Sequence, residues 1–303
     1  MHDVIIIGAG PAGLAAAAYC LRKRLDILVI APDLGGKANY RMQVAGLEGY
    51  EHITGEEVVR KFRSQLQYLD FAQVKDKAAK LEVVLGPARE TFAVTTAAGQ
   101  RFAARAVILA TGVDPIRLGA PGEDKALGRG LSYSAVSHAP LFWDKDTAVV
   151  GNGDLALRSA AELATVARRV FLVAPAGLPE SPLKHKLAGQ DNVTILEHYR
   201  LAGVETNGFV KGITLAAPDG RQEELPVTGV FGELGWKPQS GLLAGLAALD
   251  AEGFVMVDDR CRSSRPGLFA AGDVTNAFGE QVLIAIGEGA KAALAAYDYL
   301  LAP

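Results

Sequence analysis

The feature that most constrains this chain is a strand, a glycine-rich turn and a helix, a pattern that occurs twice. The first copy starts with an apolar run at residues 4–7 and continues through Gly8-Ala9-Gly10-Pro11-Ala12-Gly13 into an alanine-rich helix. The first glycine permits a tight turn, the second lets a pyrophosphate approach the backbone, and the third allows close packing of helix and strand. Free amides at the helix N-terminus hold the phosphates. This unit is predicted to bind a dinucleotide.

The second copy lies far downstream, where an apolar run at residues 147–150 leads into a glycine-rich turn and a helix predicted to reach about Arg168. Its candidate nicotinamide nucleotide contacts are Gly151, Gly153, Asp154 and Ala156. The next strand ends in Ala174-Pro175-Ala176, which offers no acid for a ribose hydroxyl and no arginine for a 2′-phosphate. Binding of NADH or NADPH is therefore doubtful, since a βαβ turn needs such glycines even without a ligand. If either cofactor binds, NADPH is expected to have no advantage.

Two other segments are candidates for the first dinucleotide site. Asp33 follows the second apolar run and either binds the adenosine ribose or only forms a turn with Pro32. Near the end, a short apolar strand finishes in Gly272-Asp273, and Gln281 opens a long helix. A carboxylate at a strand end can accept hydrogen bonds from a sugar alcohol, and a helix N-terminus offers free amides. These groups suit the ribitol and pyrimidine edge of a flavin, although Gly-Asp alone would also fit a simple turn.

In this order the motifs resemble the low-molecular-weight thioredoxin reductases and the flavoprotein component of alkyl hydroperoxide reductase. The resemblance covers essentially the whole chain and includes Gly35-Gly36-Lys37, where the family has Gly-Gly-Gln, and Ala110-Thr111-Gly112. It implies an α/β fold with two Rossmann-like, three-layer nucleotide-binding domains, FAD as cofactor and a homodimer. The predicted FAD contacts are Gly8, Gly10, Pro11, Ala12, Gly13, Asp33, Gly36, Lys37, Ala78, Thr111, Gly112, Gly272, Asp273, Gln281 and Val282.

The FAD domain is expected to be discontinuous. Residues 1–114 form its first part, residues 115–239 an inserted NAD(P)-binding-like domain, and residues 240–303 its second part. Pro115 and Pro121-Gly122 mark the first linker. The capping pattern Thr54-Gly55-Glu56-Glu57 predicts a helix start within the first part.

The resemblance fails at the reaction centre. The family has a Cys-x-x-Cys pair followed by Asp, in which one thiol attacks the substrate and the other exchanges electrons with the flavin. The matching residues here are Ser134, Ser137 and His138. A serine hydroxyl cannot form a redox-active disulfide, so the disulfide-reductase reaction is excluded. His138 either transfers a proton to or from the flavin or is a solvated loop histidine.

Composition limits the environment and the partners. The chain has two cysteines, and their scarcity fits a reducing, cytoplasmic compartment. Cys20 is predicted to be a buried packing residue; the arginines beside Cys261 favour a lowered pKa, but we expect no redox role. The net charge of −3 gives no reason to expect nucleic acid or an anionic membrane as partner. With no signal peptide and no apolar span of transmembrane length, we expect a soluble protein; no metal site is predicted.

Two classes of function remain. The first is an FAD-dependent oxidoreductase that passes electrons between the flavin and a quinone, oxygen, a small electron-transfer protein or a dissociable flavin. Family relatives without active-site thiols serve as ferredoxin reductases, which makes this class plausible. The alternative is a catalytically silent flavoprotein with a structural, sensing or partner-binding role. We favour the first, because the expected FAD contacts are kept while the thiols and the phosphate-reading residues are changed.

Overall fold

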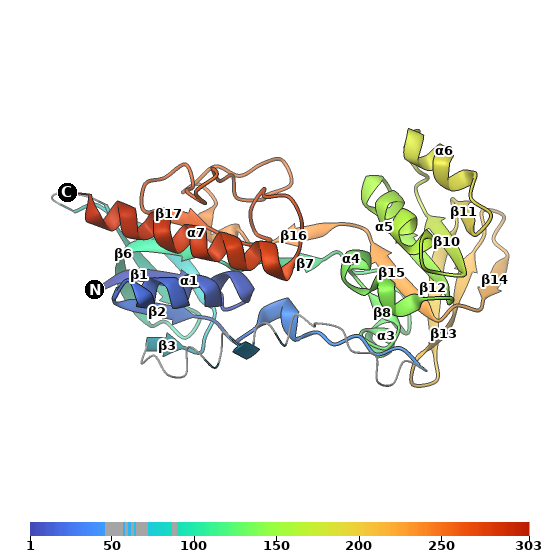
Figure 1. The fold of residues 1–303 in the computed structure, drawn as a ribbon, viewed down its shortest axis with the longest axis horizontal. Coiled ribbons are helices and arrows are strands. Elements are labelled where there is room, and N and C mark those ends of the chain that lie inside the picture. Colours follow the sequence, from blue (N-terminus) through green and yellow to red (C-terminus); the bar gives the residue numbers. More distant parts are fainter. Residues whose placement is uncertain (46–56, 58–59, 62–63, 65–71, 87–89, 303) are drawn as a thin grey trace. The chain divides into compact units, whose positions relative to one another are not determined.

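The computed structural model describes residues 1–45, 57, 60–61, 64, 72–86 and 90–302 of the 303-residue chain. It contains two compact units, drawn as ribbons in Figure 1. Unit 1 comprises Met1–Tyr40, Ile53–Asp114 and Lys237–Pro303, and unit 2 comprises Arg41–His52 and Pro115–Trp236. Thr54, Gly55 and Glu56, on which the predicted helix cap depends, lie outside the described residues.

Unit 1 is built on a mainly parallel sheet that has seven strands among the described residues. Its strand order is β3-β2-β1-β6-β5-β4, and β17 also pairs with β6. The pairs β1–β2, β1–β6, β2–β3 and β6–β17 are parallel, whereas β4–β5 and β5–β6 are antiparallel. The strands are β1 (His2–Ile7), β2 (Ile27–Ile30), β3 (Ala72–Val74), β4 (Ala78–Val84), β5 (Thr91–Thr96), β6 (Arg101–Leu109) and β17 (Leu268–Ala270).

The apolar run of β1 is buried on both faces, as expected of a central parallel strand. One face carries the helices α1 (Pro11–Arg22) and α7 (Val282–Leu301), which lie side by side in Figure 1. Small residues make that packing close, because a Cβ atom built on Gly289 would lie 2.0 Å from the carbonyl oxygen of Ala12. The N-termini of α1 and α7 consequently reach the carboxyl edge of the sheet.

Unit 2 has three layers. Its parallel sheet has the strand order β11-β10-β9-β15-β8. Residues of α5 and α6 form the core on one face, and residues of the antiparallel β12-β13-β14 sheet form the core on the other. The elements are α3 (Glu123–Ala126), β8 (Leu131–Ser132), α4 (Ala135–His138), β9 (Asp146–Gly151), α5 (Asp154–Ala164), β10 (Arg169–Ala174), α6 (Pro182–Ala188), β11 (Val193–Glu197), β12 (Arg200–Thr206), β13 (Val210–Ala216), β14 (Gln222–Leu225) and β15 (Gly229–Glu233).

The remaining elements are short: the 3-10 turns η1 (Gly36–Asn39), η2 (Ala139–Phe142) and η3 (Gly241–Leu243), and the paired strands β7 (Val113–Pro115) and β16 (Trp236–Pro238). One sequence prediction is wrong in detail, because α5 ends at Ala164 rather than near Arg168. Arg168 lies beyond the helix end and donates two hydrogen bonds, at 2.9 and 2.7 Å, to the buried carboxylate of Asp146. The mixed α/β architecture with two Rossmann-type units confirms the predicted fold class.

Candidate cofactor sites

The three glycines of the first turn have different surroundings. Gly8 has a φ of +103°, and a Cβ atom there would lie 2.3 Å from the carbonyl oxygen of Ala110. A Cβ atom on Gly13 would lie 2.0 Å from the carbonyl oxygen of Gly8. Around Gly10, by contrast, no atom of the described residues lies within 4 Å of that position. The first and third glycines therefore allow close packing, and the second borders open space.

The N-terminus of α1 opens onto the same space. Gly10 is its N-cap and Pro11 its first residue, and no described side chain caps the helix. The first amides of a helix have no partner within it, so those of Ala12 and Gly13 can donate to an anion. Gly36 lies on the other side, where its added Cβ atom would be 3.4 Å from Cα of Gly10. This cradle has the shape and the donors that a pyrophosphate requires.

Asp33 has a local role in the loop that holds Gly36. Its Oδ1 accepts a hydrogen bond from the amide of Gly36 at 3.2 Å. The amide of Gly35 donates to the carbonyl oxygen of Ala9 at 2.7 Å, which ties this loop to the glycine turn. This geometry gives Asp33 the turn-forming role. Its carboxylate is exposed, and the second oxygen is able to accept a hydrogen bond from a ribose hydroxyl.

A cluster of three charged residues, the Lys37 cluster, joins distant parts of unit 1. Lys37 Nζ lies 2.8 Å from Oδ2 of Asp273 and 3.4 Å from Oε2 of Glu280. Burial raises the pKa of Glu280 to about 7; nearby Lys37 opposes the rise and Asp273 adds to it. The sequence predicts Lys37 and Asp273 as FAD contacts, and the structure brings them together. The sequence patterns do not predict Glu280 as a member of this group, although it directly precedes Gln281, which is a predicted contact.

The turn at Gly272 is fixed against both helices. Its amide donates to Oε2 of Glu288 on α7 at 2.7 Å, and an added Cβ atom would lie 2.9 Å from Cβ of Ala12 on α1. Burial raises the pKa of the Glu288 carboxyl. Gln281 is the N-cap of α7, and no described side chain caps this helix. Asp273, the α1 N-terminus and the α7 N-terminus therefore lie around the same edge of the sheet.

The other predicted FAD contacts are less closely grouped. Thr111 Oγ1 donates to the carbonyl oxygen of Gln239 at 2.7 Å, and Gly112 follows with a φ of +70°. Val282, the first residue of α7, packs on the core beneath α1 and α7. Ala78 is buried in the core on the face of the sheet opposite α1 and α7. That core does not include the glycine turn, so it does not bring Ala78 together with the other predicted FAD contacts.

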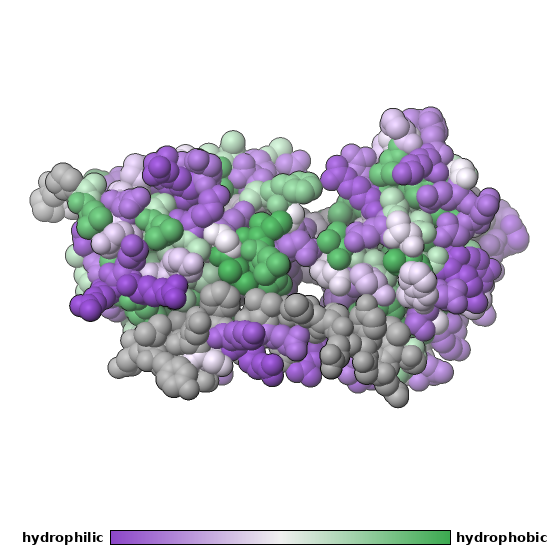
Figure 2. Space-filling model, viewed as in Figure 1, coloured by the Kyte–Doolittle hydropathy of each residue, from purple (hydrophilic) through white to green (hydrophobic). Residues whose placement is uncertain are grey.

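Apolar side chains are exposed next to this site. Figure 2 shows hydrophobic residues gathered over the N-terminal end of α7. Phe278, Leu283 and Ile284 are 86, 73 and 37% exposed there. Exposed apolar patches mark ligand or protein contacts. Together with the open cradle, the free helix amides and Asp273, this surface fits a dinucleotide with a large planar ring, which FAD is.

The second glycine turn repeats the arrangement of the first. A Cβ atom on Gly151 would lie 2.2 Å from the carbonyl oxygen of Glu233 and 3.0 Å from Cβ of Ala156. No atom of the described residues lies within 4 Å of the same position on Gly153. The second turn differs from the first by Asp154, which has an exposed carboxylate in the first turn of α5. This is the place where a phosphate would accept hydrogen bonds from the helix amides. Unit 2 therefore keeps an open cradle beside a charge that repels phosphate.

Ser134 and Ser137 make a helix cap in unit 2. Ser134 is the N-cap of α4; its Oγ accepts from the amide of Ser137 at 3.3 Å and lies 3.0 Å from the Ser137 hydroxyl. Nδ1 of His138 lies 2.8 Å from Oγ of Ser132, a buried residue. The amide of Ala135 donates to the buried carboxylate of Glu233 at 3.2 Å. These contacts fix the loop and orient the imidazole of His138.

Neither cysteine has the environment of a reactive thiol. Cys20 and Cys261 are unpaired and belong to the same apolar core of unit 1. Burial raises the pKa of each thiol to about 12. The arginines beside Cys261 therefore do not lower its pKa. A thiol that stays protonated neither attacks a disulfide nor exchanges electrons efficiently.

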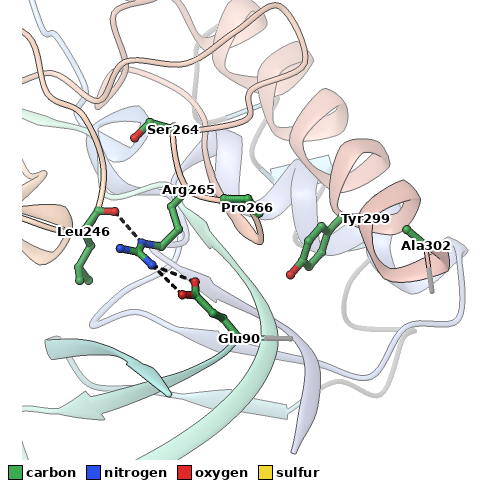
Figure 3. Close-up of a pocket in the computed structure, with 7 residues that line it drawn as sticks. All are labelled: Glu90, Leu246, Ser264, Arg265, Pro266, Tyr299 and Ala302. Carbon is green, nitrogen blue, oxygen red and sulfur yellow. Dashed lines mark hydrogen bonds and ion pairs between the residues drawn. The ribbon is translucent and has the colours of Figure 1, made fainter. Parts of the chain in front are cut away.

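Figure 3 shows a cavity of about 660 Å³ beside Glu90, Arg265 and Tyr299. Two of its polar groups are already paired, because Arg265 binds Glu90 at 2.9 and 3.1 Å and donates to the carbonyl oxygen of Leu246 at 2.9 Å. It lies where β17 begins and α7 ends, at the edge of the sheet opposite the glycine turn. Open α/β sheets bind ligands at the carboxyl ends of their strands, so we assign no cofactor here.

Within the described residues, none of the helices has the length and hydropathy needed to span a bilayer. The same part of the chain contains no cluster of three or more His, Cys, Asp or Glu side chains placed to bind a metal ion.

Known proteins resemble the chain over its whole length. A profile described as pyridine nucleotide-disulphide oxidoreductase matches residues 2–289. An alkyl hydroperoxide reductase component of Pseudomonas putida is 33% identical, and NADH dehydrogenase of Bacillus subtilis (strain 168) is 30% identical. Each match covers 99% of this chain and 58% of the relative, so the chain spans about three-fifths of their length. The crystal structure of thioredoxin reductase from Streptococcus pyogenes superposes with a TM-score of 0.89 at 32% identity, covering 99% of this chain and 98% of that one.

Proposed function

The chain belongs to the pyridine nucleotide-disulphide oxidoreductase family, and from that premise we propose an FAD-dependent oxidoreductase whose electron partner is not a disulfide. The observation that carries the proposal is the pair Ser134 and Ser137. The Ser134 hydroxyl caps α4 by accepting from the amide of Ser137, and it also contacts the Ser137 hydroxyl. By the resemblance, these two serines match the family's redox thiols. The two cysteines of the chain, Cys20 and Cys261, are buried, and burial raises the pKa of each thiol to about 12.

The residues around the first glycine turn would hold FAD. The amides of Ala12 and Gly13 would bind the pyrophosphate at the open side of Gly10, and Asp273 would accept a hydrogen bond from the ribitol. The amides at the N-terminus of α7 would hold the pyrimidine edge. Bound FAD supplies one- and two-electron transfer at its isoalloxazine ring. Lys37 keeps the Asp273 carboxylate in place through their ion pair.

His138 is the proposed proton carrier. An imidazole exchanges protons near neutral pH, as a serine hydroxyl does not. The hydroxyl of Ser132 lies within hydrogen-bond distance of Nδ1 of His138 and so orients the imidazole that would carry the proton. Among residues 134–138, His138 has the only ionisable side chain.

Different observations favour and oppose a nicotinamide nucleotide as the electron donor. The open cradle at Gly153 and the relative named NADH dehydrogenase favour a nicotinamide donor, whereas Asp154 opposes phosphate binding. Quinone, oxygen, a small electron-transfer protein or a dissociable flavin remain the candidate acceptors. A homodimer in the cytoplasm completes the proposal. The alternative is a silent flavoprotein, which would bind FAD but would not exchange electrons with a donor.

The visible spectrum of the purified protein tests the proposal. We expect a yellow protein with a single FAD per chain, because separate segments of unit 1 converge on the cradle. Anaerobic titration with NADH and NADPH should then bleach the flavin. A colourless protein that takes up no added FAD would overturn the proposal as a whole. Bound FAD that neither nicotinamide nor reduced ferredoxin bleaches would instead support the silent flavoprotein.

A further inference from the structure

Glu280 is an ionisable group beside the candidate FAD site that the proposed function does not use. It directly precedes Gln281, the N-cap of α7, whose first amides would hold the pyrimidine edge of FAD. Its side chain is 31% exposed, and Lys37 Nζ lies 3.4 Å from its Oε2. Glu280 therefore lies at the same edge of the sheet as the groups that would hold the isoalloxazine ring.

Lys37 serves two carboxylates at unequal distances. Its Nζ lies 2.8 Å from Oδ2 of Asp273, which is the more buried partner at 16% exposed, and farther from Glu280. With both carboxylates ionised, one cation faces two anions. The anions repel each other, and a proton goes first to the one with the weaker contact to the cation, which is Glu280. Burial raises the pKa of Glu280 to about 7. Glu280 is therefore about half ionised near neutral pH.

The charged groups that act on Glu280 come from separate segments of unit 1. Lys37, in η1, stabilises the Glu280 carboxylate, whereas Asp273, after β17, favours its protonated form. Glu288 on α7 interacts electrostatically with Asp273, and its Oε2 accepts from the amide of Gly272. These neighbours are the same whether FAD is oxidised or reduced, so the charge of FAD is what changes the proton affinity of Glu280.

Reduction of FAD adds negative charge to this site. Two electrons and a single proton leave the isoalloxazine ring with one more negative charge. A nearby like charge raises the pKa of a partly buried carboxyl group by on the order of one unit. For a group that is half ionised, a rise of this size increases the proton occupancy from about one half to about nine tenths. A carboxyl group placed and charged like Glu280 therefore responds to the redox state.

We propose that Glu280 takes up a proton when FAD in unit 1 is reduced, while Lys37 stays paired with Asp273. The reaction consumes two electrons and two protons. One proton goes to the isoalloxazine ring, and the other converts the Glu280 carboxylate to the neutral acid, so the net charge of the site does not change. The inference rests on the proposed binding of FAD in unit 1, and it is independent of the electron donor, the acceptor and His138.

The test measures proton uptake during anaerobic reduction of the full-length protein with bound FAD. An electrode with mediator dyes supplies the electrons and gives the midpoint potential, and a pH indicator in weakly buffered solution gives the protons consumed per FAD. Near pH 7 the wild type should take up about 0.4 proton per FAD more than Glu280→Gln, whose amide does not titrate. The excess should decline toward about pH 5 and pH 9, because Glu280 then has the same protonation state before and after reduction.

The midpoint potential gives an independent measure of the same proton. Since the reduced protein binds more protons, the potential falls as pH rises. Between about pH 7 and pH 8 it should fall more steeply in the wild type than in Glu280→Gln. Glu280→Asp retains a titrating group and should keep part of the excess uptake. Lys37→Gln removes the cation that opposes protonation and should move the excess to higher pH.

A matched control separates this group from general charge effects. Glu252→Gln removes a carboxylate from an exposed position of unit 1 and should behave like the wild type. Equal proton uptake by the wild type and Glu280→Gln at equal FAD content, or an excess that Glu252→Gln also removes, would overturn this inference and leave the FAD assignment standing. A protein that takes up no FAD would overturn the proposed function and this inference with it.

Discussion

Alanine at Gly10 and alanine at Gly8 should have opposite effects, although the two glycines are two residues apart. Gly10 has φ −70° and ψ −174°, which alanine adopts freely, and an added methyl group meets no described atom within 4 Å. Gly8 has φ +103°, and its methyl group would lie 2.3 Å from the carbonyl oxygen of Ala110. The first substitution therefore fills the space assigned to FAD, and the second disturbs the fold.

The magnitudes follow from these environments. Replacing glycine by alanine at a compatible position stabilises a protein by about 0.4–1 kcal/mol, so Gly10→Ala should raise the free energy of unfolding of the apoprotein. The same methyl group keeps a pyrophosphate from the amides of α1, which weakens FAD binding by about 1.5–3 kcal/mol for each charge-assisted hydrogen bond lost. Gly8→Ala combines backbone strain with a steric clash and should lower the free energy of unfolding by roughly 2–6 kcal/mol.

Two measurements on each apoprotein separate these effects: urea unfolding gives the stability, and quenching of FAD fluorescence gives the affinity. Gly10→Ala should be at least as stable as the wild type and should bind FAD at least about tenfold more weakly. If Gly10→Ala bound FAD as tightly as the wild type, the open space at Gly10 would not be the cofactor's place. If Gly8→Ala proved as stable as Gly10→Ala, the packing role assigned to the first glycine would be refuted.

Three further outcomes are expected. Asp273→Ala should weaken FAD binding by roughly 10- to 150-fold, the equivalent of one charge-assisted hydrogen bond, while Asp259→Ala at an exposed position should not; unchanged affinity would leave Asp273 a turn residue. Neither the native protein nor Ser134→Cys/Ser137→Cys should oxidise NADH or NADPH with thioredoxin or small disulfides; turnover by the native protein would contradict the central proposal, and turnover by the double variant alone would show that only the thiols are missing. Because the folded protein raises the pKa of Glu280 from 4.5 to about 7, its protonated carboxyl favours folding, and this contribution is lost as pH rises through that range. Glu280→Gln should therefore flatten the pH dependence of apoprotein melting there, and an unchanged slope would rule this group out.

The features that sequence predicts well are local ones. Gly8, Gly10 and Gly13 lie within one turn, so their spacing already contains the geometry that the structure shows. That residues 134 and 137 are serines, whose hydroxyls form no disulfide, can likewise be read from the sequence without coordinates.

What sequence could not predict depends on long-range folding. The ion pair of Lys37 and Asp273 joins residues that are far apart in the chain, and the charge of Glu280 has meaning only beside them. Arg168 lies outside the helix and binds the buried carboxylate of Asp146, which lies at the start of β9, before the whole of α5.

The cap of α4 has a consequence for any attempt to introduce thiols into this loop. A hydroxyl accepts a hydrogen bond from the amide of Ser137 far better than sulfur does, and loss of such a cap costs about 0.5–2 kcal/mol. Ser134→Cys alone would lose this stability at once, whereas a dithiol is present only after Ser137 is also replaced. The serine that excludes disulfide chemistry therefore also stabilises the helix start.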